Sequence, residues 1–227
     1  MTRPGQPEDL DDPRLLWTRA AVMAVCGAAE PASPSGLSVD DDGITADIGG
    51  GSYWWKLTLA PDGEAVFSGR DADRSRTRLM DEPVPLLDGL PDRLSWKRLR
   101  EDMERDALGF VYWHADGAWH RVDYPDDLED DGLGAPLEHV AGDVETTDWV
   151  LLDKRLDDEV NARRAVADVL AKAHENTLRP ADVTTMLGVL DPDVGSDAAR
   201  TKAALDAAVR TGLLAGTRPP LIGAPAE

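Results

Sequence analysis

Two alternating segments joined by a tight turn, residues 53–60 and 64–70, constrain the fold of this chain more than any other feature. They read YWWKLTLA and EAVFSGR, and the Pro-Asp-Gly between them is typical of a hairpin turn. Side chains alternate between the two faces of a strand, so the adjacent Trp54 and Trp55 must point to opposite faces. The sequence therefore predicts an antiparallel hairpin with one tryptophan on each side.

Pairing the hairpin across a three-residue loop collects apolar side chains on one face: Trp55, Leu57, Leu59, Ala65 and Phe67. That face is the predicted core, and Trp55 is its tryptophan. Trp54 lies on the mixed face, opposite Arg70, whose guanidinium can stack on an indole. Two interpretations of Trp54 remain open. It packs under a helix or loop, or it is an exposed aromatic anchor of the kind found at protein interfaces.

A second hairpin is predicted at residues 110–124, where Asp116-Gly117 is a strong turn signal. The pairing places Trp113 opposite His120 and puts Trp119 on the other face. Both faces are then aromatic, so at least one should meet another element of the chain. His114 and His120 point to opposite faces, and no zinc site is expected.

The remaining pattern predicts an α+β fold, with an antiparallel sheet of hairpins packed by helices and followed by a helical C-terminal region. A further hairpin turns at Asp42-Gly43, and a short strand is expected at residues 149–152. Helices are expected over residues 12–29, 92–108, 157–177, 180–190 and 196–214.

These elements predict four parts of the chain. Residues 1–11 form a disordered acidic tail, 12–156 an α+β domain, 157–216 a helical region, and 217–227 a flexible tail.

The charge is strongly negative and unevenly distributed. The chain carries 44 acidic and 24 basic residues, for a net charge of −20. Residues 1–156 hold 33 acidic and 16 basic residues, whereas 157–227 hold 11 and 8. Such a chain repels phosphates and anionic membranes, so direct binding to nucleic acid or to a membrane is not expected. A basic protein is the expected partner. The polar N-terminus, without a signal-peptide pattern, predicts a cytoplasmic protein.

Six carboxylates fall within residues 123–131. The stretch DLEDDGLGAPLE partly fits a calcium loop, with Asp127, Glu129, Asp131, Gly132 and Glu138 at ligand or turn positions. Glu at position three, Gly at position eight and a proline in the loop argue against calcium, and no metal is expected. The segment is either a solvated loop or a partner face that steers association.

No phosphate-binding loop or nucleophile elbow is present in the sequence, so we assign no catalytic or cofactor-binding residues and expect no cofactor. The lone Cys26 lies in an apolar helical run and is expected to be a buried thiol. The candidate partner-binding residues are Trp54, Arg70, Trp119, Asp126, Asp127, Asp130 and Asp131.

The segments WWKLTLAPDGEAVFSGRDAD and GFVYWHADGAWHRVDYPDDLEDDGL resemble uncharacterised actinobacterial proteins that pair two tryptophan-rich hairpins. They are also similar in style to the acidic α+β immunity proteins of bacterial toxin systems. The resemblance covers roughly residues 45–135 and implies a non-enzymatic, immunity or antitoxin-like protein that binds a basic partner. Two alternatives stay open: a small enzyme or ligand-binding domain with an aromatic cleft near Trp54 or Trp119, and a regulatory protein that mimics DNA.

Overall fold

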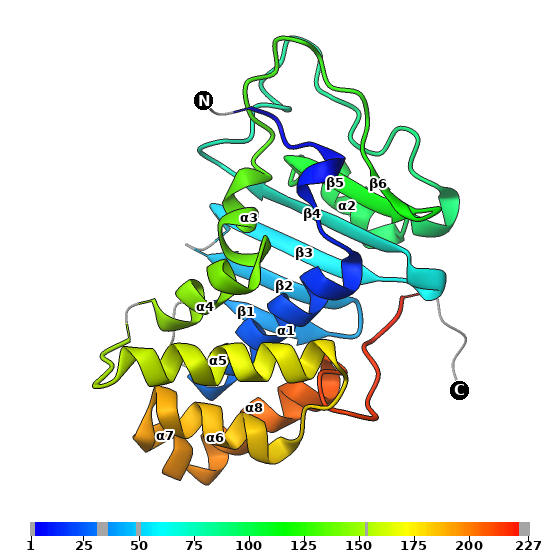
Figure 1. Ribbon diagram of the computed structural model, residues 1–227. Helices are drawn as coiled ribbons and strands as arrows, with labels where there is room; N and C mark the ends of the chain where they lie inside the picture. Colours follow the sequence, from blue (N-terminus) through cyan, green and yellow to red (C-terminus); the bar gives the residue numbers. More distant parts are fainter. Residues whose placement is uncertain (1–2, 31–35, 49–50, 153, 223–227) are drawn as a thin grey trace.

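The computed structural model describes residues 3–30, 36–48, 51–152 and 154–222. Its centre is a six-stranded antiparallel sheet in which each strand pairs with the next along the chain (Figure 1). The strands are β1 (Leu37–Asp40), β2 (Gly43–Ile48), β3 (Tyr53–Leu59), β4 (Ala65–Asp71), β5 (Phe110–Ala115) and β6 (Ala118–His120). This sheet, with its helices and its helical C-terminal region, confirms the predicted α+β class.

The β3–β4 hairpin has the predicted register, with Leu57 opposite Phe67 and Trp54 opposite Arg70. In its turn both Asp62 and Gly63 adopt positive φ angles, of 61° and 77°. The β5–β6 hairpin also forms as predicted, with Trp113 opposite His120. The β1–β2 hairpin turns one residue earlier than predicted, because Asp40 pairs with Gly43. In each case local turn chemistry and period-two alternation were sufficient to predict the hairpin.

Eight α-helices are described. They are α1 (Pro13–Ala29), α2 (Lys97–Glu104), α3 (Gly134–Val140), α4 (Asp143–Leu151), α5 (Glu159–His174), α6 (Pro180–Leu190), α7 (Pro192–Ser196) and α8 (Ala198–Arg210). Short 3-10 turns occupy η1 (Pro7–Asp9), η2 (Pro61–Gly63) and η3 (Asp92–Leu94). Among the described residues no helix is long and apolar enough to cross a membrane.

Three local predictions were wrong. Residues 149–151 end helix α4 instead of forming a strand, because Thr146, Thr147, Val150 and Leu151 are buried at helical spacing. The helix expected over 92–108 is reduced to α2, since Asp106 takes a positive φ of 56° just after it. The helix expected from residue 196 starts later: Ser196 ends α7, and Asp197 caps α8 by accepting the amides of Ala199 and Arg200.

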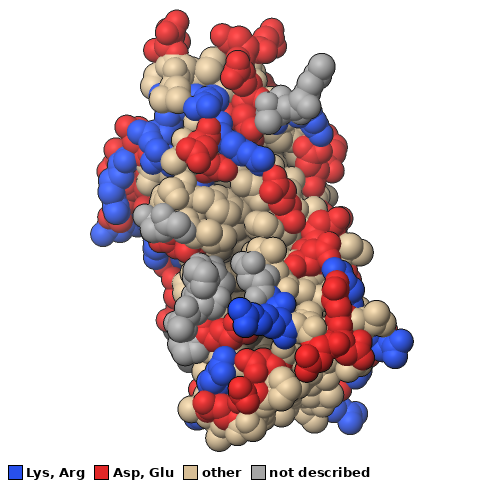
Figure 2. All heavy atoms as spheres, turned by 90° about the vertical axis from the view of Figure 1, so that its left-hand side faces the viewer, with Lys and Arg blue, Asp and Glu red and all other residues tan. Residues whose placement is uncertain are grey.

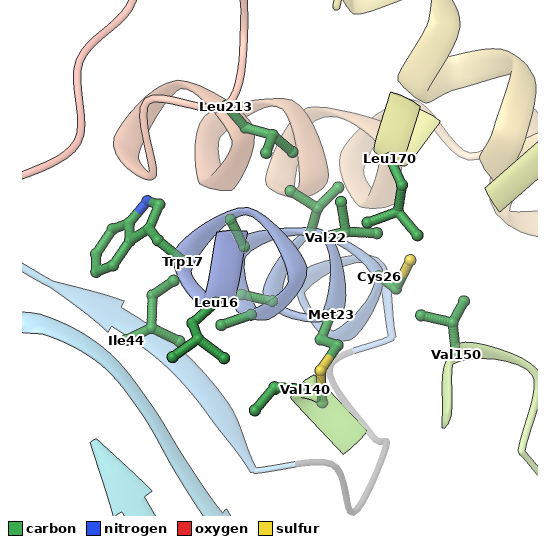
Figure 3. Packing of buried hydrophobic residues seen from close by; sticks show 14 of the residues in the cluster. Leu16, Trp17, Val22, Met23, Cys26, Ile44, Val140, Val150, Leu170 and Leu213 are labelled. Carbon is green, nitrogen blue, oxygen red and sulfur yellow. The ribbon is translucent and has the colours of Figure 1, made fainter. Parts of the chain in front are cut away.

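Helix α1 is buried on nearly all of its sides (Figure 3). Leu16 points toward Ile44 of the sheet, and Val22 points the opposite way, toward Leu170 and Leu213. An apolar helix of this kind must be covered all round. The sheet covers one side, and the C-terminal helices α5 and α8 cover the other, so the sheet and the helical region share one core.

Cys26 lies within this core, as expected for a buried thiol. Burial is the main cause that raises the pKa of its thiol to about 12, so the group stays protonated at neutral pH.

The opposite face of the sheet carries a second, smaller apolar cluster. It joins Val66, Val111 and Trp113 of the sheet to Leu99 of α2 and to leucines of the segment 84–94. Figure 1 shows α2 on the side of the sheet away from α1. This cluster packs mainly on β4 and β5. The candidate site described below lies on the same face, over β2 and β3.

We expect the two adjacent tryptophans to differ in their contribution to stability. Trp55 is fully buried in the core cluster that includes α1, and its ring meets Phe67 edge-on at 5.7 Å between centroids. Trp54 is only half-buried on the other face. Trp55→Ala should therefore lower the free energy of unfolding by about 3–5 kcal/mol, and Trp54→Ala by much less. Chemical denaturation measures both, and equal large losses would contradict this assignment.

Candidate functional site

Three of the predicted partner-binding residues are buried. Trp119 is 8% exposed, Asp130 8% and Asp131 0%. The carboxylate of Asp131 accepts four hydrogen bonds, from the hydroxyls of Tyr112 (2.7 Å) and Tyr124 (3.0 Å) and from the amides of Gly5 (3.0 Å) and Leu133 (3.1 Å). These residues therefore hold the chain together instead of presenting a surface to a partner.

The groups around Asp131 titrate far from their usual ranges. Burial, and after it the Asp131 carboxylate, raises the pKa values of Tyr112 and Tyr124 well above those of free phenols, so both hydroxyls remain donors. Burial also raises the pKa of Asp130, although the amide of Gly132 that donates to it opposes the shift. The arrangement is that of a hydrogen-bonded structural carboxylate.

The N-terminal segment is the element that these residues hold. Besides the bond from Gly5 to Asp131, the guanidinium of Arg121 donates to the carbonyl of Gly5 and to the side chain of Gln6. The indole of Trp119 donates to the carbonyl of Asp11 at 2.7 Å. Residues 3–11 are thus packed against β6 and the following loop, and the expectation of a disordered tail was wrong for them; residues 1–2 lie outside the described part.

This packing also bears on the acidic segment 123–131. The calcium-like pattern cannot assemble around Asp131, because protein donors already occupy its oxygens, and Glu138 pairs with Arg74 at 3.0 Å. Asp126 and Asp127 are exposed, whereas Asp130 and Asp131 are buried. The solvated part of the acidic segment is therefore smaller than the sequence suggested. Among the described residues the guanidinium found over an aromatic ring is that of Arg121, over Tyr124 at 4.1 Å, rather than that of Arg70 over Trp54.

Trp54, in contrast, lines a cleft of about 270 Å³ on the second face of the sheet. The floor of the cleft comes from β2, β3 and β4, and α2 with the residue before it forms one wall. The lining residues are Asp42, Thr45, Asp47, Trp54, Lys56, Thr58, Val66, Ser68, Trp96, Arg98, Leu99, Asp102, Ala107 and Ile222.

The C-terminal segment contributes a further wall. It returns from α8 to the sheet (red in Figure 1), and the amide of Ile222 donates to the carbonyl of Leu59 at 2.9 Å. The predicted flexible tail therefore packs on the sheet as far as residue 222, and residues 223–227 lie outside the described part.

Strand register explains why polar groups meet on the floor of the cleft. Thr45, Lys56 and Ser68 stand side by side on three neighbouring strands. The next row along the strands contains Asp47, Trp54 and Arg70. The hydroxyl of Thr45 is buried and has no hydrogen-bond partner among the described residues. This part of the sheet face therefore carries polar side chains that are largely shielded from solvent.

The cations of the cleft are already paired. The ammonium of Lys56, whose side chain is 9% exposed, lies 3.3 Å from Asp40 and 4.0 Å from Asp42. The guanidinium of Arg98 lies 3.9 Å from both of these carboxylates. Two cations and two anions thus form one neutral network beside the β1–β2 turn.

Two carboxylates of the cleft are left without a cation. Asp47 accepts the amide of Gly51 at 2.7 Å, and among the described residues neither Asp47 nor Asp102 has a basic partner. Asp102 follows Arg98 by one helical turn on the same side of α2. Together with Trp54 and Trp96, these carboxylates give the cleft an aromatic and acidic lining.

Sequence reasoning identified Trp54 and the mixed face on which it lies but missed Trp96, Asp102 and Asp47. The sequence did contain a signal, namely the polar residues Lys56, Thr58 and Ser68 on the mixed face of the hairpin. The sequence could not show the contribution of α2, because this helix comes to the face from about 40 residues further along the chain.

Comparison of the chain with protein-family models, curated proteins and solved structures found no match. The function is therefore argued from the chemistry of the cleft and the charge of the chain.

We expect Asp131 to be a stability residue. Asp131→Ala would leave two buried phenols and two buried amides without an acceptor, and should lower the free energy of unfolding by about 3 kcal/mol. The exposed Asp127 provides the matched control, and Asp127→Ala should change it by less than about 0.5 kcal/mol. Urea denaturation of both variants is the measurement. A loss below about 1 kcal/mol for Asp131→Ala would show that the N-terminal segment does not depend on this carboxylate.

Proposed function

We propose that this protein is a non-enzymatic binding module that engages a basic protein through the cleft over β2–β4, in the manner of an immunity or antitoxin-like protein. The observation that carries the proposal is the cleft itself, lined by two indoles and by two carboxylates that have no basic partner in the part of the chain that the structure describes. Aromatic side chains of this kind commonly supply most of the binding energy at protein interfaces. Trp54 lies on a strand of the sheet and Trp96 directly precedes α2, and such regular elements suit the two indoles to that role.

The net charge of −20 supports a basic partner. Figure 2 shows one face of the molecule, on which acidic side chains are spread widely with basic ones between them. Such a distribution attracts a cationic protein from a distance and raises the association rate, mainly at low salt. On the face in view, the charges do not form the long uninterrupted row of carboxylates that a mimic of DNA would need, so we favour that alternative less.

A second candidate function is supported by the same cleft. The hydroxyls of Thr45, Thr58 and Ser68 and the buried Lys56 could orient a small ligand. The alternative of a small enzyme or ligand-binding domain requires such groups. The volume of about 270 Å³ is below the roughly 300–1,000 Å³ typical of small-molecule sites. We therefore rank a protein partner first, and a small molecule that raises the melting temperature of the isolated protein would reverse that order.

The proposal is tested by affinity capture from the native host. The wild-type protein and the double variant Trp54→Ala/Trp96→Ala are used as baits at low salt, and captured proteins are quantified by mass spectrometry. We expect a basic protein that is captured at least about tenfold less by the double variant, a loss equivalent to about 1.4 kcal/mol.

Val160→Ala/Val209→Ala is the matched control, because it removes two exposed apolar side chains from the helical region without touching the cleft. This control should capture the same partner as the wild type. If the double tryptophan variant captures that partner equally well, the interface lies elsewhere and the proposal fails. Circular dichroism of each bait establishes that it is folded.

A further inference from the structure

We propose that the cleft receives the side chain of a single arginine from the basic partner. This inference rests on the proposed function and specifies the chemistry of recognition. It follows from three properties of the cleft: the charges that are already neutralised, the nature of the walls, and the size of the hollow.

The charges favour a cation. Lys56 and Arg98 are neutralised by Asp40 and Asp42 beside the β1–β2 turn. An anion entering the cleft would have to displace those carboxylates, and would do so on a chain of net charge −20. Asp47 and Asp102 have no basic partner among the described residues, so a cation entering near them makes new ion pairs and breaks none.

The position of these carboxylates keeps the entering cation away from Lys56. Asp47 and Trp54 stand one row along the strands from Lys56, and successive residues on one face of a strand are about 7 Å apart. Asp102 lies one helical turn, about 6 Å, beyond Arg98 on α2. Repulsion from Lys56 and Arg98 is reduced at such separations. Arg70, which stands opposite Trp54, is a nearer cation, and the ion pairs with Asp47 and Asp102 must outweigh its repulsion.

The walls favour arginine over lysine. The guanidinium is planar, stacks on an indole face and donates to carboxylates in a fixed fork, whereas an ammonium is a compact and strongly hydrated point charge. Trp54 and Trp96 supply the indoles, and Asp47 and Asp102 supply the acceptors. The aliphatic stem of the arginine finds apolar contacts with Leu99 and Ile222.

The unpaired hydroxyl of Thr45 is a further polar group, able to donate or to accept, that an occupant of the cleft could satisfy. It is buried at the lining of the cleft without a partner among the described residues. A buried polar group in this condition costs about 1–3 kcal/mol until it is satisfied.

The size of the cleft favours one side chain. A volume of about 270 Å³ is small for a whole ligand and suits a single long side chain presented by a larger partner. The partner's backbone would then rest on the rim formed by α2 and the β1–β2 turn.

The test uses short peptides and the wild-type protein labelled with ¹⁵N. Three capped heptapeptides differ only at the central residue of a Gly/Ser sequence, which is arginine, lysine or citrulline; citrulline keeps the shape of arginine and lacks its charge. The indole N–H signals of the seven tryptophans are followed during titration, after assignment by Trp→Phe substitution. Trp17 is the internal reference, because its indole is bonded to the carbonyl of Thr211 in the core around α1.

We expect the arginine peptide to shift the signals of Trp54 and Trp96 saturably and leave that of Trp17 unchanged. The citrulline peptide should bind at least about tenfold more weakly, since it loses the charge-assisted hydrogen bonds. Asp47→Asn and Asp102→Asn should each weaken binding of the arginine peptide about threefold or more. Asp47→Asn can still accept the amide of Gly51, so this hydrogen bond is retained.

Asp88→Asn is the matched control, because it removes an exposed carboxylate that does not line the cleft. It should leave the affinity unchanged. Equal binding of citrulline and arginine, equal weakening by all three Asn variants, or tighter binding of lysine would each overturn the assignment to arginine.

The two proposals can fail separately. If partner capture depends on Trp54 and Trp96 but the arginine peptide does not bind, the binding function stands and the inference about arginine is wrong. If the peptide binds as expected but capture of the partner ignores both tryptophans, the site binds arginine and the proposed interface is wrong.

Discussion

The structure depends on the burial of α1 on all sides. A surface helix needs only one apolar stripe, whereas this helix has Leu16 facing the sheet and Val22 facing the C-terminal helices. Neither the sheet nor the helical region could cover it alone. The requirement to bury α1 therefore joins two regions of very different charge into one core on one face of the sheet.

The second face of the sheet is completed by other means. Over β4 and β5 it is closed by leucines of the segment 84–94 and by α2. Over β2 and β3 the side chains that face outward are polar apart from Trp54, and Lys56 is buried only because Asp40 and Asp42 accompany it. The cleft lies at the boundary between these two halves, which explains why it combines indoles with ion pairs.

The acidity of the chain has two separate physical uses. Some carboxylates are internal acceptors: Asp131 holds Gly5 and two tyrosines, and Asp143 binds the buried Arg19 at 2.8 Å. Others remain at the surface, where they influence association over about a Debye length. The local density of acidic residues in the sequence does not show which carboxylates are internal acceptors and which stay at the surface. The most densely acidic segment, residues 123–131, contains the most deeply buried carboxylate.

The sequence by itself determined the three hairpins, the register of β3–β4 and β5–β6, and the face of each tryptophan in β3, because these follow from turn residues and from alternation within about 20 residues. It also determined where α1 and α6 begin and end, since Asp12-Pro13 and Pro180 mark helix starts. Only the tertiary structure decided what each face meets. Trp119 and Asp131 meet residues 5–11 from more than 100 positions earlier, and Trp54 meets α2 and the C-terminal segment. The local sequence shows how polar a face is but not which distant element will cover it. Residues 149–151, which looked like a strand, pack as the end of helix α4.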